Sequence, residues 1–385
     1  MIQYLRNLHR QYQLKQPLVK AFELAGVYLK YKNGAGKELH ILPIIHSIKE
    51  HTDYTTYTFT LPDGINPQLF DKHLYVFQQV FGEHISFDGT VKQFTLTVRA
   101  KVIDVEPFDY DYDSVSRLCK KVLLPIYCGT SIEGTPIIYD MVTSPHLLIA
   151  GETGSGKSTQ LRSILTTLIL HNDPSQLRLY LADMKRSEFH LFRNVAHVEE
   201  VCNRVHQLSK MIFSVRAEIE RRGDLLDEAE LSHIDDYNRT RKDKLPYLVL
   251  CIDEVAFLKK EEAIMEVIED ISAVGRALGV FLILSMQRPD ADVLDGKLKN
   301  NLTVRMGFKC ADLINSKIIG VPGAESLTEK GRFLMKSVEL TEIQAPYLDL
   351  EKAKVLLAPY KVTPKPKQVD NEDILFEAFD GGSGR

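Results

Sequence analysis

The residues with the clearest chemistry lie at positions 151–158, in the stretch GETGSGKS. This stretch fits the pattern Gly-x-x-x-x-Gly-Lys-Ser/Thr, with an apolar run before it and a helical pattern after it. Its glycines let successive backbone N–H groups point at phosphate oxygens, and the start of a helix adds partial positive charge. We therefore predict a site for a nucleoside triphosphate, ATP. Lys157 is expected to contact the β- and γ-phosphates, and the Ser158 hydroxyl to ligate Mg²⁺. The expected nucleotide contacts are Gly151, Glu152, Thr153, Gly154, Ser155, Gly156, Lys157, Ser158 and Thr159.

ATP hydrolysis requires a magnesium ligand and a general base in addition to nucleotide binding, and two adjacent acidic residues can supply them. The run LVLCIDE ends in Asp253 and Glu254, after five apolar positions that predict a buried strand. Asp253 is expected to hold the magnesium ion through water, and Glu254 to polarise the attacking water as general base. The sequence thus predicts an ATPase.

Two further kinds of residue could complete such a site. Gln287 ends the apolar run VFLILSMQ and is our candidate for sensing the γ-phosphate, the alternative being an amide that caps a backbone group. An arginine from a neighbouring copy often stabilises the transferring phosphoryl group. Arg276 is the first candidate for that arginine, and Arg305 and Arg288 are the alternatives. A surface or structural role stays open for each of the three.

The elements that would position these residues alternate along the chain. Strand-like runs are HLLIAG, LRLYLAD, YLVLCIDE, VFLILSMQ and TVRMGFKC, and helical patterns cover residues 157–171, 201–222 and 261–278. Apolar strands that alternate with helices predict an α/β fold whose parallel sheet is covered on both faces.

A different pattern precedes this region. Residues 38–103 contain the alternating run TYTFTLPDG, a hairpin pattern around Asp88 and Gly89, and a helical pattern over 67–82. We expect a small α+β module for oligomerisation or partner docking over residues 1–110, an ATPase motor over 111–348 and a flexible tail over 349–385.

Composition narrows the class of protein. The 385 residues carry a net charge of −4, so any nucleic-acid contact must come from a local basic patch. The five cysteines form no CxxC pair, which argues against a zinc site or a disulfide framework and favours buried thiols. No apolar run has the ~18 residues of a membrane span, and the first residues lack a secretory pattern. We expect a cytoplasmic protein that partners recruit to the membrane.

Several motifs, in this order, resemble the FtsK/SpoIIIE family of hexameric DNA-pumping motors within the HerA/FtsK superfamily. They are GETGSGKS, DMKRSEF, CIDEVAFL, GRALGVFLILSMQRPDADVLDGKLKNNLTVRMGFKC and SKIIGVPGAESLTEKGRFLM. The resemblance covers residues 123–346 and implies a RecA-like P-loop NTPase core, an ATP site between adjacent subunits and duplex DNA in a central pore. It also matches Gln287 to the sensor glutamine of the family, and Arg276 to the trans arginine of related coupling ATPases.

The same resemblance places pore loops near residues 184–190 and 290–301. Lys185, Arg186, Lys297 and Lys299 are then expected to contact DNA phosphates irrespective of base sequence, and the alternative for each is a solvated loop residue. The stretches GKELHILPIIHSI, YTTYTFTLPDG and FQQVFGEHISFDG resemble the N-terminal part of FtsK-like proteins of Gram-positive conjugative elements and plasmids. Chromosome-segregating members carry a membrane domain and a winged helix that this sequence does not show. The resemblance therefore implies a motor for transfer, mobilisation or replication of a mobile element.

Three functions remain open at this point. The first is an ATP-driven translocase of double-stranded DNA that works as a ring, expected to be a hexamer. The second is a protein-secretion motor, against which the loop lysines at 185, 297 and 299 argue. The third is an adaptor that docks a relaxase or a replication initiator and binds ATP structurally, against which the Asp253–Glu254 pair argues.

Overall fold

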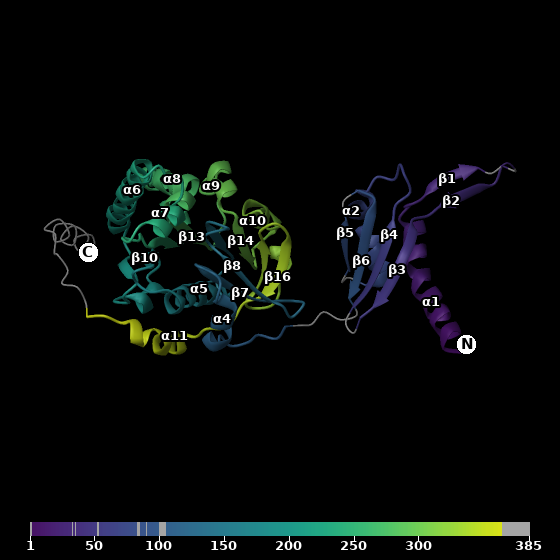
Figure 1. The fold of residues 1–385 in the computed structure, drawn as a ribbon, viewed down its shortest axis with the longest axis horizontal. Coiled ribbons are helices and arrows are strands. Elements are labelled where there is room, and N and C mark those ends of the chain that lie inside the picture. The colour runs from purple at the N-terminus through teal and green to yellow at the C-terminus, as the bar shows by residue number, and fades with distance from the viewer. Residues whose placement is uncertain are drawn as a thin grey trace, which may run out of the picture. The chain divides into compact units, whose positions relative to one another are not determined.

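The computed structural model describes residues 2–32, 34, 36–51, 54–82, 85–89, 91–99 and 105–363 (Figure 1). The chain divides into two compact units, Met1–Asp104 and Val105–Arg385. The α+β pattern expected for the N-terminal region lies in the first unit, and the α/β pattern expected for the rest lies in the second. The first boundary falls at 104/105 rather than 110/111, because residues just after it pair with the second unit: Tyr110 N–H donates to Tyr347 O at 2.8 Å.

The first unit is an antiparallel sheet packed against helices. Its sheet order is β3-β4-β6-β5, and a separate hairpin pairs β1 with β2. The strands are β1 (Leu29–Lys32), β2 (Glu38–Ile41), β3 (Ile44–Glu50), β4 (Tyr54–Thr60), β5 (Ile85–Gly89) and β6 (Gln93–Arg99), and the helices are α1 (Ile2–Leu24), α2 (Leu69–Lys72) and α3 (Leu74–Phe81). Aromatic side chains fill its core; Phe22, for example, packs edge-on against Phe59 and Phe77. The predicted hairpin and helical region are confirmed, the helix being divided at His73 and ending before Gly82.

A ten-stranded sheet organises the second unit, in the order β11-β10-β12-β13-β9-β14-β15-β16-β7-β8. The strands from β11 to β14 in this order are parallel, and the remainder are joined antiparallel. The strands are β7 (Pro125–Ser131), β8 (Pro136–Asp140), β9 (Leu147–Ala150), β10 (Leu177–Asp183), β11 (Val198–Cys202), β12 (Tyr247–Asp253), β13 (Val280–Met286), β14 (Val304–Phe308), β15 (Arg332–Lys336) and β16 (Leu340–Gln344). The prediction of a parallel sheet is therefore confirmed for the half of the sheet that carries the phosphate loop and the Asp253–Glu254 pair.

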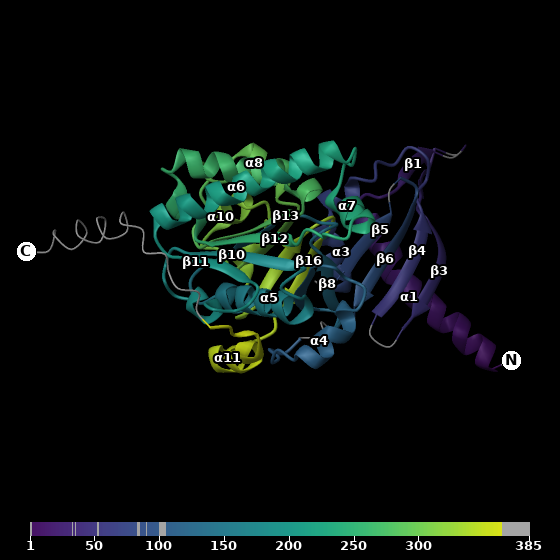
Figure 2. The same cartoon turned by 60° about the vertical axis from the view of Figure 1, so that its left-hand side comes forward.

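Helices cover both faces of this sheet, as expected for strands that are apolar throughout. Figure 2 shows α6 and α8 on one side and α5, α4 and α11 on the other. The helices of the unit are α4 (Tyr112–Cys119), α5 (Lys157–His171), α6 (Val205–Glu228), α7 (Ile234–Thr240), α8 (Glu262–Leu278), α9 (Gly296–Asn301), α10 (Leu313–Ile318) and α11 (Leu350–Leu357), with short 3₁₀ turns η1 (Phe189–Phe192), η2 (Val255–Leu258), η3 (Ala324–Ser326) and η4 (Ala358–Tyr360).

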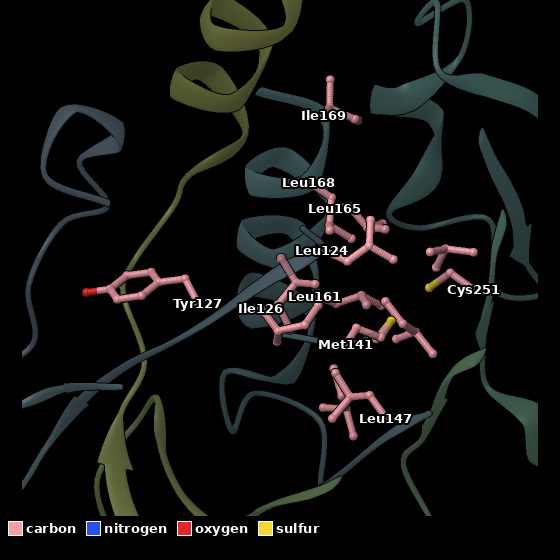
Figure 3. Packing of buried hydrophobic residues seen from close by; sticks show 14 of the residues in the cluster. Leu124, Ile126, Tyr127, Met141, Leu147, Leu161, Leu165, Leu168, Ile169 and Cys251 are labelled. Atoms are coloured by element: carbon pink, nitrogen blue, oxygen red, sulfur yellow. The ribbon is translucent and has the colours of Figure 1, made fainter. Parts of the chain in front are cut away.

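The apolar side of α5 forms the centre of one core layer. Leu161, Leu165 and Leu168 lie among residues of β7 and β9 in Figure 3, with Cys251 of β12 beside them. All five cysteines are free and buried, as the sequence predicted, and burial raises the pKa of the Cys251 thiol. Among the described helices, none has both the length and the apolar character that a membrane crossing requires.

Two predicted boundaries need correction. The predicted helix over 201–222 begins later and runs longer, as α6, because residues 201 and 202 end strand β11. The tail expected from residue 349 begins instead as helix α11, whose Ala353 and Leu357 are fully buried in the core of the second unit. After α11 the chain forms the short turn η4, and Lys361 pairs with Val195 in an isolated antiparallel bridge. Residues 364–385 of the expected tail lie outside the described residues.

Candidate active site

The phosphate loop joins β9 to α5 in a backbone conformation that needs glycine. Gly151, Gly154 and Gly156 have φ values of 156°, 83° and 110°, which L side chains rarely adopt. A Cβ on Gly151 would lie 2.5 Å from Phe308 Cβ, and one on Gly156 would lie 2.8 Å from Gly331 Cα. The loop is therefore closely packed by β14 and by the turn at residue 331.

Lys157 lies deep in the site at the start of α5. Its ammonium donates to Ser285 Oγ at 2.6 Å and to Asp253 Oδ1 at 3.2 Å, and Ser285 Oγ donates to Asp253 at 3.0 Å. Both charged side chains are at most 4% exposed. The register of the parallel strands brings these groups together, because Asp183, Asp253 and Ser285 are consecutive neighbours at the ends of β10, β12 and β13.

Glu254 follows β12 directly and is held in an uncommon conformation. Its φ of 71° is left-handed, which costs a non-glycine residue about 1–3 kcal/mol and persists only where surrounding contacts fix it. The backbone N–H of Gln287 donates to both carboxylate oxygens at 3.1 Å, and Lys185 Nζ lies 2.5 Å from Oε2. The side chain is 5% exposed.

Gln287 connects this carboxylate to the phosphate loop. Thr153 Oγ1 donates to Gln287 Oε1 at 3.1 Å. The side-chain oxygen of Gln287 thus contacts a loop hydroxyl rather than a backbone group, and the Gln287 backbone holds Glu254. A hydrogen-bonded path therefore runs from Thr153 through Gln287 and Glu254 to Lys185.

A cavity of about 450 Å³ adjoins the loop, which is within the size range of small-molecule sites. One wall consists of phosphate-loop residues together with Gln287. The rest of the cavity wall was missed by the sequence analysis and includes Pro107, Lys330, Gly331, Pro346 and Tyr347. Of the quoted motifs, only EKGRFLM reaches this wall, and nothing in its local pattern indicates a contact with the loop.

The residues expected to hold Mg²⁺ supply suitable oxygen donors. Ser158 lies at the start of α5 and lines the cavity, and the nearly buried Asp253 ends β12. Within the described part of the chain, no group of three or more His, Cys, Asp or Glu residues is placed to hold a metal ion. Mg²⁺ is usually bound through one or two protein oxygens, waters and substrate phosphates, and Ser158 and Asp253 would supply the protein oxygens.

The four expected DNA-contacting residues have different surroundings. Arg186 and Lys297 are exposed, whereas Lys185 is turned toward Glu254. Lys299 is half-buried and donates to Lys317 O at 3.2 Å, and desolvation together with nearby Arg305 lowers its pKa. The two exposed residues therefore fit a phosphate contact better than Lys299 does.

The three candidate arginines also differ in their exposure and hydrogen bonds. Arg305 donates to Leu302 O and Lys299 O, so it ties the end of α9 to β14 and has a structural role within its own subunit. Arg288 is exposed after β13, and Arg276 is exposed in the last turn of α8. Arg276 and Arg288 remain the candidates for a contact with a neighbouring copy.

Residues 112–291 match the FtsK/SpoIIIE family model. The DNA translocase FtsK of Borreliella burgdorferi is 29% identical over 388 aligned positions, which cover 97% of this chain and 47% of the relative. The DNA translocase FtsK of Helicobacter pylori strain 26695 is 34% identical over 267 positions, 66% of this chain and 31% of the relative. The chain thus spans less than half the length of these curated relatives.

Two solved structures extend the comparison. The pCW3 conjugation coupling protein TcpA, in its monomer form with ATPγS, is 27% identical with a TM-score of 0.61, and the match covers 89% of this chain and 98% of TcpA. The cytoplasmic domain of the Thermomonospora curvata type VII secretion ATPase EccC is 26% identical with a TM-score of 0.58, covering 64% of this chain and 32% of EccC. The part of the chain that carries the phosphate loop and the Asp253–Glu254 pair therefore belongs to the FtsK/SpoIIIE family.

Proposed function

We propose that this chain is an ATP-driven motor that moves double-stranded DNA and works as a ring of identical copies, a hexamer. The observation that carries the proposal is the hydrogen-bonded path from Thr153 to Lys185. It connects the phosphate loop to the general base, and the general base to a loop expected to contact DNA. The family match of residues 112–291 supports the same activity.

Each residue of the site has a defined task in this proposal. Loop N–H groups and Lys157 hold the β- and γ-phosphates, while Ser158 and Asp253 hold Mg²⁺, which offsets phosphate charge. Glu254 accepts a proton from the attacking water. Gln287 contacts the loop through its side chain and Glu254 through its backbone. It can therefore couple the presence of the γ-phosphate to the orientation of the Glu254 carboxylate.

Transfer or mobilisation of a mobile element is the process we propose. The support is the match to TcpA, a conjugation coupling protein, which covers 89% of this chain and therefore extends into the N-terminal unit. In this proposal the N-terminal unit mediates ring assembly or docks a relaxase or replication initiator, and such partners bring the chain to the membrane. The similarity to EccC favours a secretion motor as the second candidate, but it covers only 64% of this chain.

The test measures both hydrolysis and movement. We expect ATP turnover to rise when long duplex DNA is added, and a triplex-forming strand to be displaced from duplex DNA only with ATP. Glu254→Gln is the matched control, because it keeps the shape of the site and removes the base; hydrolysis should fall by about 10²–10⁴-fold with nucleotide still bound. ATP turnover indifferent to DNA, with no triplex displacement, would contradict the proposal.

A further inference from the structure

The contact between Lys185 and Glu254 has a consequence for when hydrolysis can occur. Lys185 Nζ lies 2.5 Å from Glu254 Oε2, and the two side chains are 22% and 5% exposed. The same carboxylate accepts the Gln287 N–H on both oxygens. The general base of the proposed reaction is therefore already engaged by a cation and by a backbone donor.

A carboxylate in this state is a poor general base. It has to approach the attacking water within hydrogen-bond distance and accept its proton, and a cation on the accepting oxygen opposes both. The opposition is strong where water is largely excluded, since charge pairs are screened less there than at a surface. The Gln287 contact is a different case, because a neutral N–H orients the carboxylate without cancelling its charge.

The backbone next to Lys185 is held in place, whereas the Lys185 side chain can reach more than one partner. Asp183 accepts the N–H groups of Ser187, Glu188 and Phe189 at 2.9–3.1 Å, so the loop is fixed just after Lys185. Lys185 lies between strand β10 and this fixed turn, with its ammonium 6.0 Å from the ring centroid of the exposed Phe257. Its partly exposed side chain is thus within reach of Glu254 on one side and of solvent on the other.

Arg186, the next residue, is exposed and has a left-handed φ of 58°. Among the described residues, the cation that pairs with Glu254 is Lys185, and Arg186 takes no part in that contact. The loop therefore presents two adjacent cations, one directed at the general base and one directed at solvent.

We propose that Lys185 is a positioning residue that restrains Glu254 until a DNA phosphate competes for its ammonium group. Without DNA the ion pair keeps the carboxylate from the attacking water. With DNA in the pore, Lys185 exchanges the carboxylate for a phosphate, and Glu254, still oriented by Gln287, becomes free to accept a proton. This inference rests on the proposed DNA-motor function and supplies the link between DNA contact and hydrolysis.

The experiment compares Lys185→Gln with Arg186→Gln in the full chain, using duplex DNA as the probe. For Lys185→Gln we expect kcat without DNA to rise by about tenfold, the KM for ATP to stay constant and the stimulation by DNA to approach unity. Arg186→Gln should instead raise the DNA concentration needed for half-maximal stimulation.

Lys185→Arg keeps the positive charge at this position and should keep the restraint on Glu254. Lys354→Gln, which removes an exposed cation of α11, is the control and should leave the DNA-free kcat unchanged.

Two further variants keep the test decisive. Lys185→Met serves if Lys185→Gln fails to fold, and Lys185→Gln combined with Glu254→Gln must be inactive, which shows that the added turnover comes from this site. A DNA-free kcat that is unchanged or lower in both uncharged variants overturns the inference. That result is distinct from failure of the proposed function, in which the wild-type chain itself shows no stimulation by DNA.

Discussion

Arg162 and Glu188 form an ion pair of 2.6 Å that joins helix α5, which begins at the phosphate loop, to the loop that carries Lys185. The two side chains are only 9% and 17% exposed. Arg162 also donates to Leu348 O at 2.6 Å, so its guanidinium bridges three segments that are far apart in the sequence. A movement of α5 on nucleotide binding would therefore be transmitted directly to the loop proposed to contact DNA.

Glu188→Gln should destabilise the motor unit by about 2–4 kcal/mol, because it leaves a largely buried guanidinium without its counter-charge. It should also reduce the stimulation of ATP turnover by DNA more than it reduces turnover without DNA. Chemical denaturation and ATPase assays measure these effects. Glu351→Gln is the control, since the Glu351–Lys354 pair is exposed and its loss should change stability by less than ~1 kcal/mol. Equal effects of the two substitutions would contradict the argument.

Tyr347→Ala should weaken nucleotide binding with little change in kcat. The ring is 55% exposed beside the cavity, while its backbone is fixed by hydrogen bonds with Phe108 and Tyr110. A flat aromatic side chain there can stack on a nucleotide base, which contributes about 1 kcal/mol, or roughly a fivefold change in the KM for ATP. Tyr347→Phe should bind ATP normally, and Val355→Ala on the exposed side of α11 should have no effect. An unchanged KM in Tyr347→Ala would show that the ring makes no contact with the nucleotide.

The sequence predicted the parts of the site that local patterns encode. The ends of parallel strands meet at one edge of a sheet, so the order of strands and motifs is enough to place residues 151–158, Asp253 and Gln287 together. The pairing of Lys185 with Glu254 could not be predicted in this way, because the two residues are 69 positions apart and their contact depends on how two loops fold beyond the sheet.

The antiparallel half of the sheet was missed for a different reason. Strands β15 and β16 are short and only partly buried, so they lack the continuous apolar runs that identified the parallel strands. Helix α11 did carry a start signal, because Asp349 caps it by accepting the Lys352 N–H at 2.8 Å. Its eight residues are few, and the Pro- and Lys-rich stretch that follows them favoured a tail.

Gly275→Ala should destabilise the protein although Gly275 lies within helix α8, close to its C-terminal end. A Cβ at this position would come within 2.2 Å of Val280 O, so α8 would have to move away from β13. Overpacking of this kind costs about 1–3 kcal/mol. Gly223→Ala in α6 is the control, since a Cβ there meets nothing within 4 Å and alanine should stabilise that helix by about 0.5–1 kcal/mol. Thermal unfolding that shifts in the same direction for both variants would refute the steric argument.

His146 should make the protein less stable in mild acid. Burial lowers the pKa of this imidazole to about 4, and its Nδ1 accepts the Leu282 N–H at 3.0 Å. Between pH 6.5 and 4 the unfolded chain therefore binds a proton that the folded chain does not, so the free energy of unfolding falls by up to about 3 kcal/mol as the pH is lowered.

His146→Asn is the variant that tests this pH dependence. Asparagine tolerates the left-handed φ of 63° and its side-chain oxygen can accept the same N–H, but it does not titrate. Its unfolding free energy should depend less on pH across this window. A weaker slope should remain, because burial also lowers the pKa of His197. An unchanged slope would assign the acid sensitivity to other groups.

Arg276 should act on the ATP site of a neighbouring copy, which a mixing experiment can show. Arg276→Ala and Lys157→Ala should each abolish DNA-stimulated ATP turnover. When the two variants are mixed, some interfaces combine an intact phosphate loop from one copy with an intact arginine from the next, so part of the activity should return. Lys157→Ala mixed with Glu254→Gln is the control, because both residues belong to the same copy's site and every site stays broken. Activity that does not return in the first mixture, or that Arg276→Ala retains alone, would move the assignment to the exposed Arg288.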